Sequence, residues 1–152
     1  MTEVPIRLVL IAPPLGVDFG IQKGSGTAYE TLFVQRGMRG DICFDFSLTV
    51  TENRNDGRPD FRGPFVQGPR AARFVYVDVG TYAGQDDTPW ARRMKLPLDG
   101  LSWALLRQVA DKPGSRLLAR IPGTGKDGGP NCATVTPIGE WEVVTDERFG
   151  AR

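Results

Sequence analysis

Residues 41–51 carry the pattern that most constrains how this chain folds. Apolar side chains recur at every second position and the intervening side chains are mostly polar; the apolar set is Ile42, Phe44, Phe46, Leu48 and Val50. A period of two over this length is typical of a strand that buries one face and leaves the other in solvent. We therefore expect residues 41–51 to form a half-buried antiparallel strand.

Other short apolar segments, separated by turn residues, predict more strands. The chain has 19 glycines and 12 prolines spread along its length, which indicates frequent turns. The segments expected to be strands are residues 6–12, 17–22, 30–35, 61–66, 73–79, 90–98, 115–121, 132–137 and 141–144. Apolar residues at helical spacing predict one helix near residues 100–111, with Asp99 as its N-cap.

These elements predict a mainly β protein: a small antiparallel β-barrel, or a sandwich, of roughly eight to ten strands with one helix. Of the two we favour the barrel, with the helix packed across one end or flank. A chain of 152 residues fits one domain, which we place at residues 1–145. Residues 146–152 are expected to be a flexible C-terminal tail.

The run FRGPFVQGP from Phe61 to Pro69 is the most unusual part of the chain, because it contains two Gly-Pro pairs. Proline donates no backbone hydrogen bond, so the pair at positions 63 and 64 predicts an edge strand or a bulge. The next strand, residues 73–79, is apolar on both faces apart from Tyr76 and Asp78. Such a strand is either covered on both faces or lines a closed interior.

Histidine is absent from the chain. This excludes Ser-His-Asp and Cys-His nucleophile systems, imidazole acid–base catalysis and histidine-ligated metals. The two cysteines cannot form a four-cysteine zinc site. Any catalysis would have to use carboxylates, Lys, Arg, Tyr, backbone amides or a borrowed cofactor. The sequence itself indicates no metal site and no bound cofactor.

Charge and hydropathy narrow the expected partners and compartment. The chain has 19 basic and 18 acidic residues, a balance that disfavours sequence-independent nucleic-acid binding. Its apolar N-terminal segment is too short to cross a membrane and lacks a basic leader. We expect a cytoplasmic protein with no membrane or nucleic-acid partner, in which Cys43 and Cys132 are buried free thiols. A homo-oligomer is compatible with the sequence.

Several cations on neighbouring predicted strands are candidates for ligand binding. Arginine binds carboxylate and phosphate with two parallel hydrogen bonds, so part of this set could converge on one anion. The alternative is a basic outer face balanced by nearby acids. The set is Arg62, Arg70, Arg73, Arg92, Arg93 and Lys95, and our chosen ligand-binding residues are Arg62, Gln67 and Arg92.

Four residues are candidates for catalysis without histidine: Asp78, Asp45, Tyr76 and Arg73. A carboxylate base, an arginine that orients it and a tyrosine that donates to a developing oxyanion would together activate water. The alternative is a buried Asp–Arg pair with a purely structural role.

Five segments resemble a bacterial family of small domains of unknown function. They are the FRGPFVQGP run, the RFVY strand at residues 73–76, FGIQ at 19–22, RMKL at 93–96 and CATV at 132–135. The resemblance extends roughly from Leu8 to Trp141. It implies a bacterial protein of one domain and brings no activity and no site residues.

Three functions agree with these observations. The first is a β-barrel that binds a small ligand such as an anion, since a barrel of about eight strands has room for one small molecule. Its expected lining is Asp45, Tyr76, Asp78, Arg73 and Arg92. The second is a histidine-free hydrolase, isomerase or cyclase that uses the Asp/Arg/Tyr set. The third is a protein–protein interaction module that docks through the segment around Gly63 and Gly68.

Overall fold

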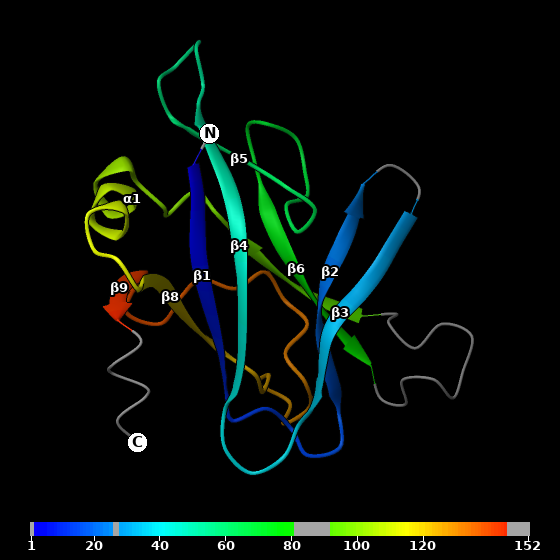
Figure 1. Ribbon diagram of the computed structural model, residues 1–152. Coiled ribbons are helices and arrows are strands. Elements are labelled where there is room, and N and C mark those ends of the chain that lie inside the picture. The colour runs from blue at the N-terminus through cyan, green and yellow to red at the C-terminus, as the bar shows by residue number, and fades with distance from the viewer. Residues whose placement is uncertain (1, 26–27, 81–91, 146–152) are drawn as a thin grey trace.

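The computed structural model describes residues 2–25, 28–80 and 92–145. Within them, nine strands form two sheets, and there is one helix (Figure 1). The elements are β1 (Thr2–Ile11), β2 (Asp18–Ser25), β3 (Ala28–Arg36), β4 (Ile42–Glu52), β5 (Pro59–Arg62), β6 (Phe74–Gly80), β7 (Arg92–Pro97), α1 (Trp103–Ala110), β8 (Ser115–Pro122) and β9 (Glu142–Thr145). The predicted β class and the single helix are therefore confirmed.

The strands form a sandwich-like pair of sheets. One sheet has the order β5-β4-β1-β8-β9 and the other the order β3-β2-β6-β7. The described strands do not close into one barrel, so the sandwich is the alternative that is observed. The expected antiparallel pairing does not hold throughout. Strands β1 and β8 run parallel, from Ile6↔Leu117 to Ile11↔Pro122. The long chain between these two strands, which includes the helix, allows them to run in the same direction.

Strand β4 follows the predicted alternation. Its apolar residues from Ile42 to Val50 are buried, whereas the intervening side chains point outward. These apolar side chains pack against the inner face of the other sheet, which contributes Phe19, Val77 and Met94 to the same core. The space between the sheets is filled by apolar side chains, as is usual for a close-packed protein interior.

The N-cap of helix α1 is Ser102 and not the predicted Asp99. The Ser102 side chain accepts a hydrogen bond from the Leu105 backbone N–H, while Leu101 closes a turn onto the carbonyl of Leu98. The helix packs against β1, β8 and β9. The Trp103 indole N–H donates to the carbonyl of Gly57 at 2.7 Å, which ties the helix to the β4–β5 turn.

Two predicted strands differ from the observed ones. Residues 132–137 form an isolated parallel bridge at Lys95↔Thr134 in place of a strand. The strand expected at 61–66 is the edge strand β5, which ends at Arg62, before Gly63 adopts a φ of +118°. This confirms the edge position that the Gly63-Pro64 pair predicts.

The remaining predictions concern the two cysteines and two segments that reach beyond the described residues. Cys43 and Cys132 are free thiols, as expected, but both are exposed and not buried. Cys43 falls on the outward face of β4, where the alternation places polar residues. The first two residues of the strand expected at 90–98 and the tail expected at 146–152 lie outside the described residues.

Candidate functional site

The candidate site is centred on Asp60, the second residue of the short edge strand β5. Asp60 lies opposite Thr51 of β4, and a tight turn joins the two strands. In that turn Asn53 and Arg58 share a backbone hydrogen bond of 2.8 Å, and Gly57, with a φ of +72°, donates to the Asn53 carbonyl. This turn holds Asp60 at a defined position on the edge of the five-stranded sheet.

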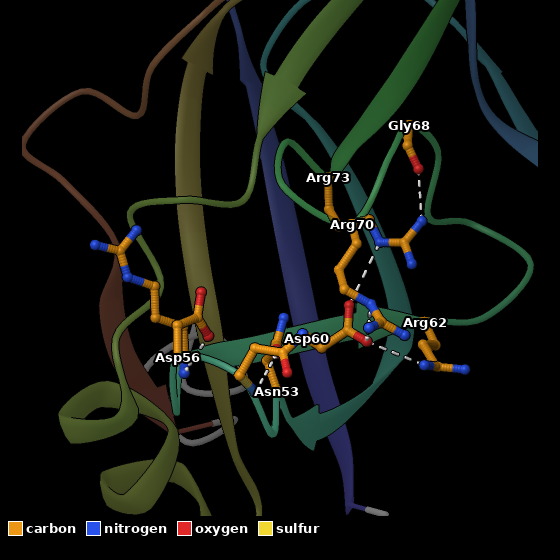
Figure 2. Close-up of polar contacts among 9 residues, drawn as sticks. Asn53, Asp56, Asp60, Arg62, Gly68, Arg70 and Arg73 are labelled. Carbon is orange, nitrogen blue, oxygen red and sulfur yellow. Dashed lines mark hydrogen bonds and ion pairs between the residues drawn. The ribbon is translucent and has the colours of Figure 1, made fainter.

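Three arginines surround the Asp60 carboxylate (Figure 2). The Nε atom of Arg62 donates to Oδ2 at 3.2 Å, and the Nε atom of Arg70 lies 3.7 Å from the same oxygen. The Nε atom of Arg73 lies 3.5 Å from Oδ1. Arg62 belongs to β5, whereas Arg70 and Arg73 come from the loop before β6, so the cluster joins both sheets.

The four charged side chains of this cluster differ in solvent exposure. The Asp60 side chain is 2% exposed, that of Arg73 24%, and those of Arg62 and Arg70 50% and 54%. Three guanidinium groups against one carboxylate leave a local charge of +2 (3 − 1). Oδ1 of Asp60 and Nε of Arg73 lie within ion-pair distance but form no hydrogen bond. The cluster therefore has positive charge in excess of its single internal anion.

The second Gly-Pro pair shapes the loop that carries two of these arginines. Gln67 and Phe74 exchange backbone hydrogen bonds of 2.8 and 3.0 Å, which close the loop. Gly68 has a φ of +89°, and a Cβ at this position would lie 2.4 Å from the Phe74 ring. The Gly68 carbonyl accepts a hydrogen bond from Nη1 of Arg73 at 2.5 Å. Only glycine fits here without strain, and its carbonyl positions Arg73.

Two hollows adjoin the cluster, and Arg70 lines both. The first, here called the polar hollow, has a volume of about 490 Å³. Its lining is Thr51, Glu52, Asn53, Arg54, Asn55, Asp60, Arg62 and Arg70. The second, here called the mixed hollow, has a volume of about 370 Å³ and an apolar floor of Pro59, Phe61, Leu98 and Leu101. Both volumes fall in the range of small-molecule sites.

The predicted site residues do not gather in one place. Arg62 and Arg73 meet at Asp60, together with Arg70. Asp45 lies on the outward face of β4, where the guanidinium of Arg7 donates to both carboxylate oxygens at 2.7 and 2.8 Å. This hydrogen bonding, stronger than the opposing effect of burial, lowers the pKa of Asp45. Asp45 therefore belongs to an ion pair on a different sheet from Asp78.

Asp78 and Tyr76 point outward from β6, opposite the core valines, and not into a closed interior as expected. The Asp78 carboxylate accepts a hydrogen bond of 2.7 Å from the Thr31 hydroxyl and a weak one of 3.5 Å from Gln22. Burial raises the pKa of Asp78, while the Thr31 hydrogen bond and the charge of Arg93 partly oppose the rise.

Tyr76 and Gln67 share a surface hollow with Arg93, whose guanidinium lies 4.7 Å from the Tyr76 ring centre. The volume of this hollow is about 380 Å³. Arg92, by contrast, lies exposed on β7 near Cys132. The predicted ligand-binding residues Arg62, Gln67 and Arg92 thus occupy three separate environments.

Sequence reasoning missed Asp60 and the role of the Gly68 carbonyl. Asp60 directly precedes the FRGPFVQGP run, but no pattern of residue types marks it as a site, and its partner Arg73 lies 13 residues away in the chain (73 − 60). The only local signal was the Gly68-Pro69 pair, which marked a special backbone but not the side chains that it positions.

In the described part of the chain, no helix is long and apolar enough to cross a membrane. Among the same residues, no three cysteine or acidic side chains lie close enough to hold a metal ion.

The fold and the site define a small two-sheet β protein with an arginine cluster on one sheet edge. The chain belongs to a family of unknown function, DUF5990, whose model matches residues 4–144. A search of curated proteins and a search of solved structures each found no match. The predicted membership of a family of unknown function is confirmed; the bacterial origin and the motif proposed to mark the family stay predictions.

Proposed function

We propose that this protein binds a small anionic ligand at the arginine cluster around Asp60. The observation that carries the proposal is the local excess of positive charge, with three guanidinium groups gathered around one buried carboxylate. Arg62 and Arg70 are half exposed, and each contacts Asp60 through its Nε atom. Their terminal N–H groups are therefore able to donate to a second anion at the surface.

The surroundings support a ligand and not only a structural ion pair. A single carboxylate has two oxygens, and here it is shared by three guanidinium groups whose Nε atoms lie 3.2 to 3.7 Å away. Charge-assisted hydrogen bonds in proteins are commonly shorter, at about 2.7–2.9 Å. The polar hollow beside the cluster also presents the Thr51 hydroxyl and the Asn53 and Asn55 amides. These uncharged groups can orient an oxyanion that the arginines neutralise.

Thermal unfolding with added anions tests the proposal. At constant ionic strength, phosphate or sulfate should raise the melting temperature relative to chloride; a ligand at 20 times its Kd stabilises by about 1.8 kcal/mol. Arg70→Gln should remove most of this effect. Arg39→Gln is the matched control, because Arg39 lies in the loop between β3 and β4, away from the cluster (Figure 1). Equal melting temperatures in all three salts would exclude anion binding.

A second candidate function is histidine-free catalysis at the hollow of Tyr76, with Asp78 as the base. The observation that favours it is the buried Asp78 carboxyl, whose pKa is raised by burial and which accepts a weak hydrogen bond from Gln22, a residue that lines this hollow. A screen with chromogenic phosphate, ester and glycoside substrates tests it. Activity that Asp78→Asn removes and Asp45→Asn keeps would support this role, and an activity that both variants keep would exclude it.

The interaction module with a partner docked around Gly63 and Gly68 stays a prediction, as does the cytoplasmic location. Gly68 is committed to the loop that positions Arg73. This leaves the arginine cluster as the better-supported reason for the second Gly-Pro pair.

A further inference from the structure

We infer that the ligand is a phosphate monoester, with its phosphate in the polar hollow against Arg62 and Arg70 and its organic group in the mixed hollow. This inference rests on the proposed function and names the chemical class of its ligand. Three features of the cluster carry it: the size of its charge excess, the direction of its donors, and the contrast between the two hollows.

The charge excess matches a dianion. The three arginines and Asp60 carry a net charge of +2, as counted above. Glu52 and Arg54, which also line the polar hollow, offset each other, and Arg73 adds its charge from the lining of the mixed hollow. A phosphate monoester carries a charge between −1.5 and −2 at neutral pH, whereas a sulfate ester or a monocarboxylate carries only −1. A phosphate ester is therefore the common biological anion that neutralises this cluster most completely.

The donors approach from more than one direction. Arg62 reaches the site from β5, and Arg70 reaches it from the loop after Pro69 (Figure 2). Thr51 and Asn53 line the same hollow from β4 and the turn that follows it. A phosphate group has three oxygens in a tetrahedral arrangement and accepts from such a set, while a planar carboxylate is best matched by one bidentate arginine.

The mixed hollow suits the uncharged part of the ligand. Its floor includes Phe61 and Leu101, and its wall includes the exposed Ala71 and Ala72, whose small side chains leave the space open. Its charged lining residues are Asp56, Asp99, Arg58, Arg70 and Arg73. The apolar floor is therefore the feature that distinguishes it from the polar hollow, whose lining has no apolar residue. Arg70 lines both hollows, so an ester bound through its phosphate at Arg70 places its organic group over this floor.

Isothermal titration calorimetry at pH 8 and constant ionic strength tests the inference with three probes. Inorganic phosphate measures the head group alone, phenyl phosphate adds a ring, and phenyl sulfate keeps the ring with one charge fewer. We expect phenyl phosphate to bind about tenfold more tightly than either of the others, which corresponds to about 1.4 kcal/mol.

A variant that fills the mixed hollow separates ring binding from phosphate binding. Ala71→Phe should lower the affinity for phenyl phosphate to that for inorganic phosphate and leave the latter unchanged. Ala104→Phe is the matched control, because Ala104 is exposed on α1 and lines neither hollow. Ala71→Leu repeats the test with a smaller side chain if the phenylalanine variant fails to fold.

The outcomes distinguish this inference from the proposed function. If no probe binds, both are wrong. If inorganic phosphate binds but phenyl phosphate binds no more tightly, or Ala71→Phe changes nothing, the proposed function stands and the ester is excluded. If phenyl sulfate binds as tightly as phenyl phosphate, the site recognises a single negative charge and the assignment to phosphate is overturned.

Discussion

Replacing Asp60 by asparagine should destabilise the protein and at the same time strengthen its binding of anions. The substitution keeps the size of the side chain and one acceptor oxygen. It removes the one negative charge that the three arginines contact among the described residues. The local charge rises from +2 to +3. Without an added anion the guanidinium groups then repel one another, and the most buried of them, Arg73, loses its counter-charge.

The exposures of the three arginines set the size of the effect. Removing one partner of a fully buried ion pair costs about 3–5 kcal/mol. The pairs with Arg62 and Arg70 are screened by solvent, because these side chains are 50% and 54% exposed, and each contributes about 0.2–1 kcal/mol. Arg73 is only 24% exposed and forms an ion pair with Asp60 without a hydrogen bond, so its contribution lies between these two limits. We therefore expect Asp60→Asn to cost about 2–3 kcal/mol in the free energy of unfolding.

Urea unfolding at pH 7 measures this loss, with and without phosphate. Asp111→Asn is the matched control, since it makes the same charge change at an exposed residue that lines neither hollow and has no ion pair among the described residues. Part of the loss in Asp60→Asn should be recovered in high salt, which screens repulsion between exposed charges. Phosphate should restore more stability to the variant than to the wild type. A loss below about 0.5 kcal/mol, or an equal response to phosphate, would refute the reasoning.

Two further pairs of substitutions test the electrostatics and the backbone. Because the pKa of Asp45 is lowered by Arg7, its contribution to stability is present above the unfolded-state pKa and is lost as the pH falls through the folded-state pKa. Asp45→Asn should thus be destabilising at pH 7, with a deficit that shrinks in acid. The pKa of Asp78 is raised by burial, so ionisation of this carboxyl opposes folding as the pH rises through the unfolded-state and then the folded-state pKa. Asp78→Asn should therefore gain stability relative to wild type as the pH rises. Urea unfolding at several pH values that shows the same sign of pH dependence for both variants would contradict this. Gly68→Ala should cost roughly 2–4 kcal/mol, because it combines a positive φ with a clash against Phe74, while Gly128→Ala, at φ +84° with nothing within 4 Å, should cost about 1–2 kcal/mol. If Gly68→Ala and Gly128→Ala lose the same free energy of unfolding in urea, the close approach at Gly68 does not contribute to the cost.

Much of the local structure could be predicted because its causes are local. The alternation along β4 follows from the geometry of an extended chain, in which successive side chains point to opposite faces. The edge position of β5 follows from the Gly63-Pro64 pair, which cannot continue a strand ladder. The apolar spacing of α1 predicted the helix, although its first residue was wrong, because Ser102 and Asp99 are both suitable N-caps by residue type.

Contacts between distant segments decided the features that the sequence did not predict. The sequence by itself determined a mainly β chain, one helix, frequent turns and the absence of imidazole chemistry. Tertiary structure alone decided that β1 and β8 run parallel and that Asp45 and Asp78 lie on different sheets. It also decided that Asp60 would be surrounded by three arginines. A repeating pattern reports which face of a strand is buried, whereas strand pairing and loop geometry determine which charges meet, and these depend on residues far apart in the chain.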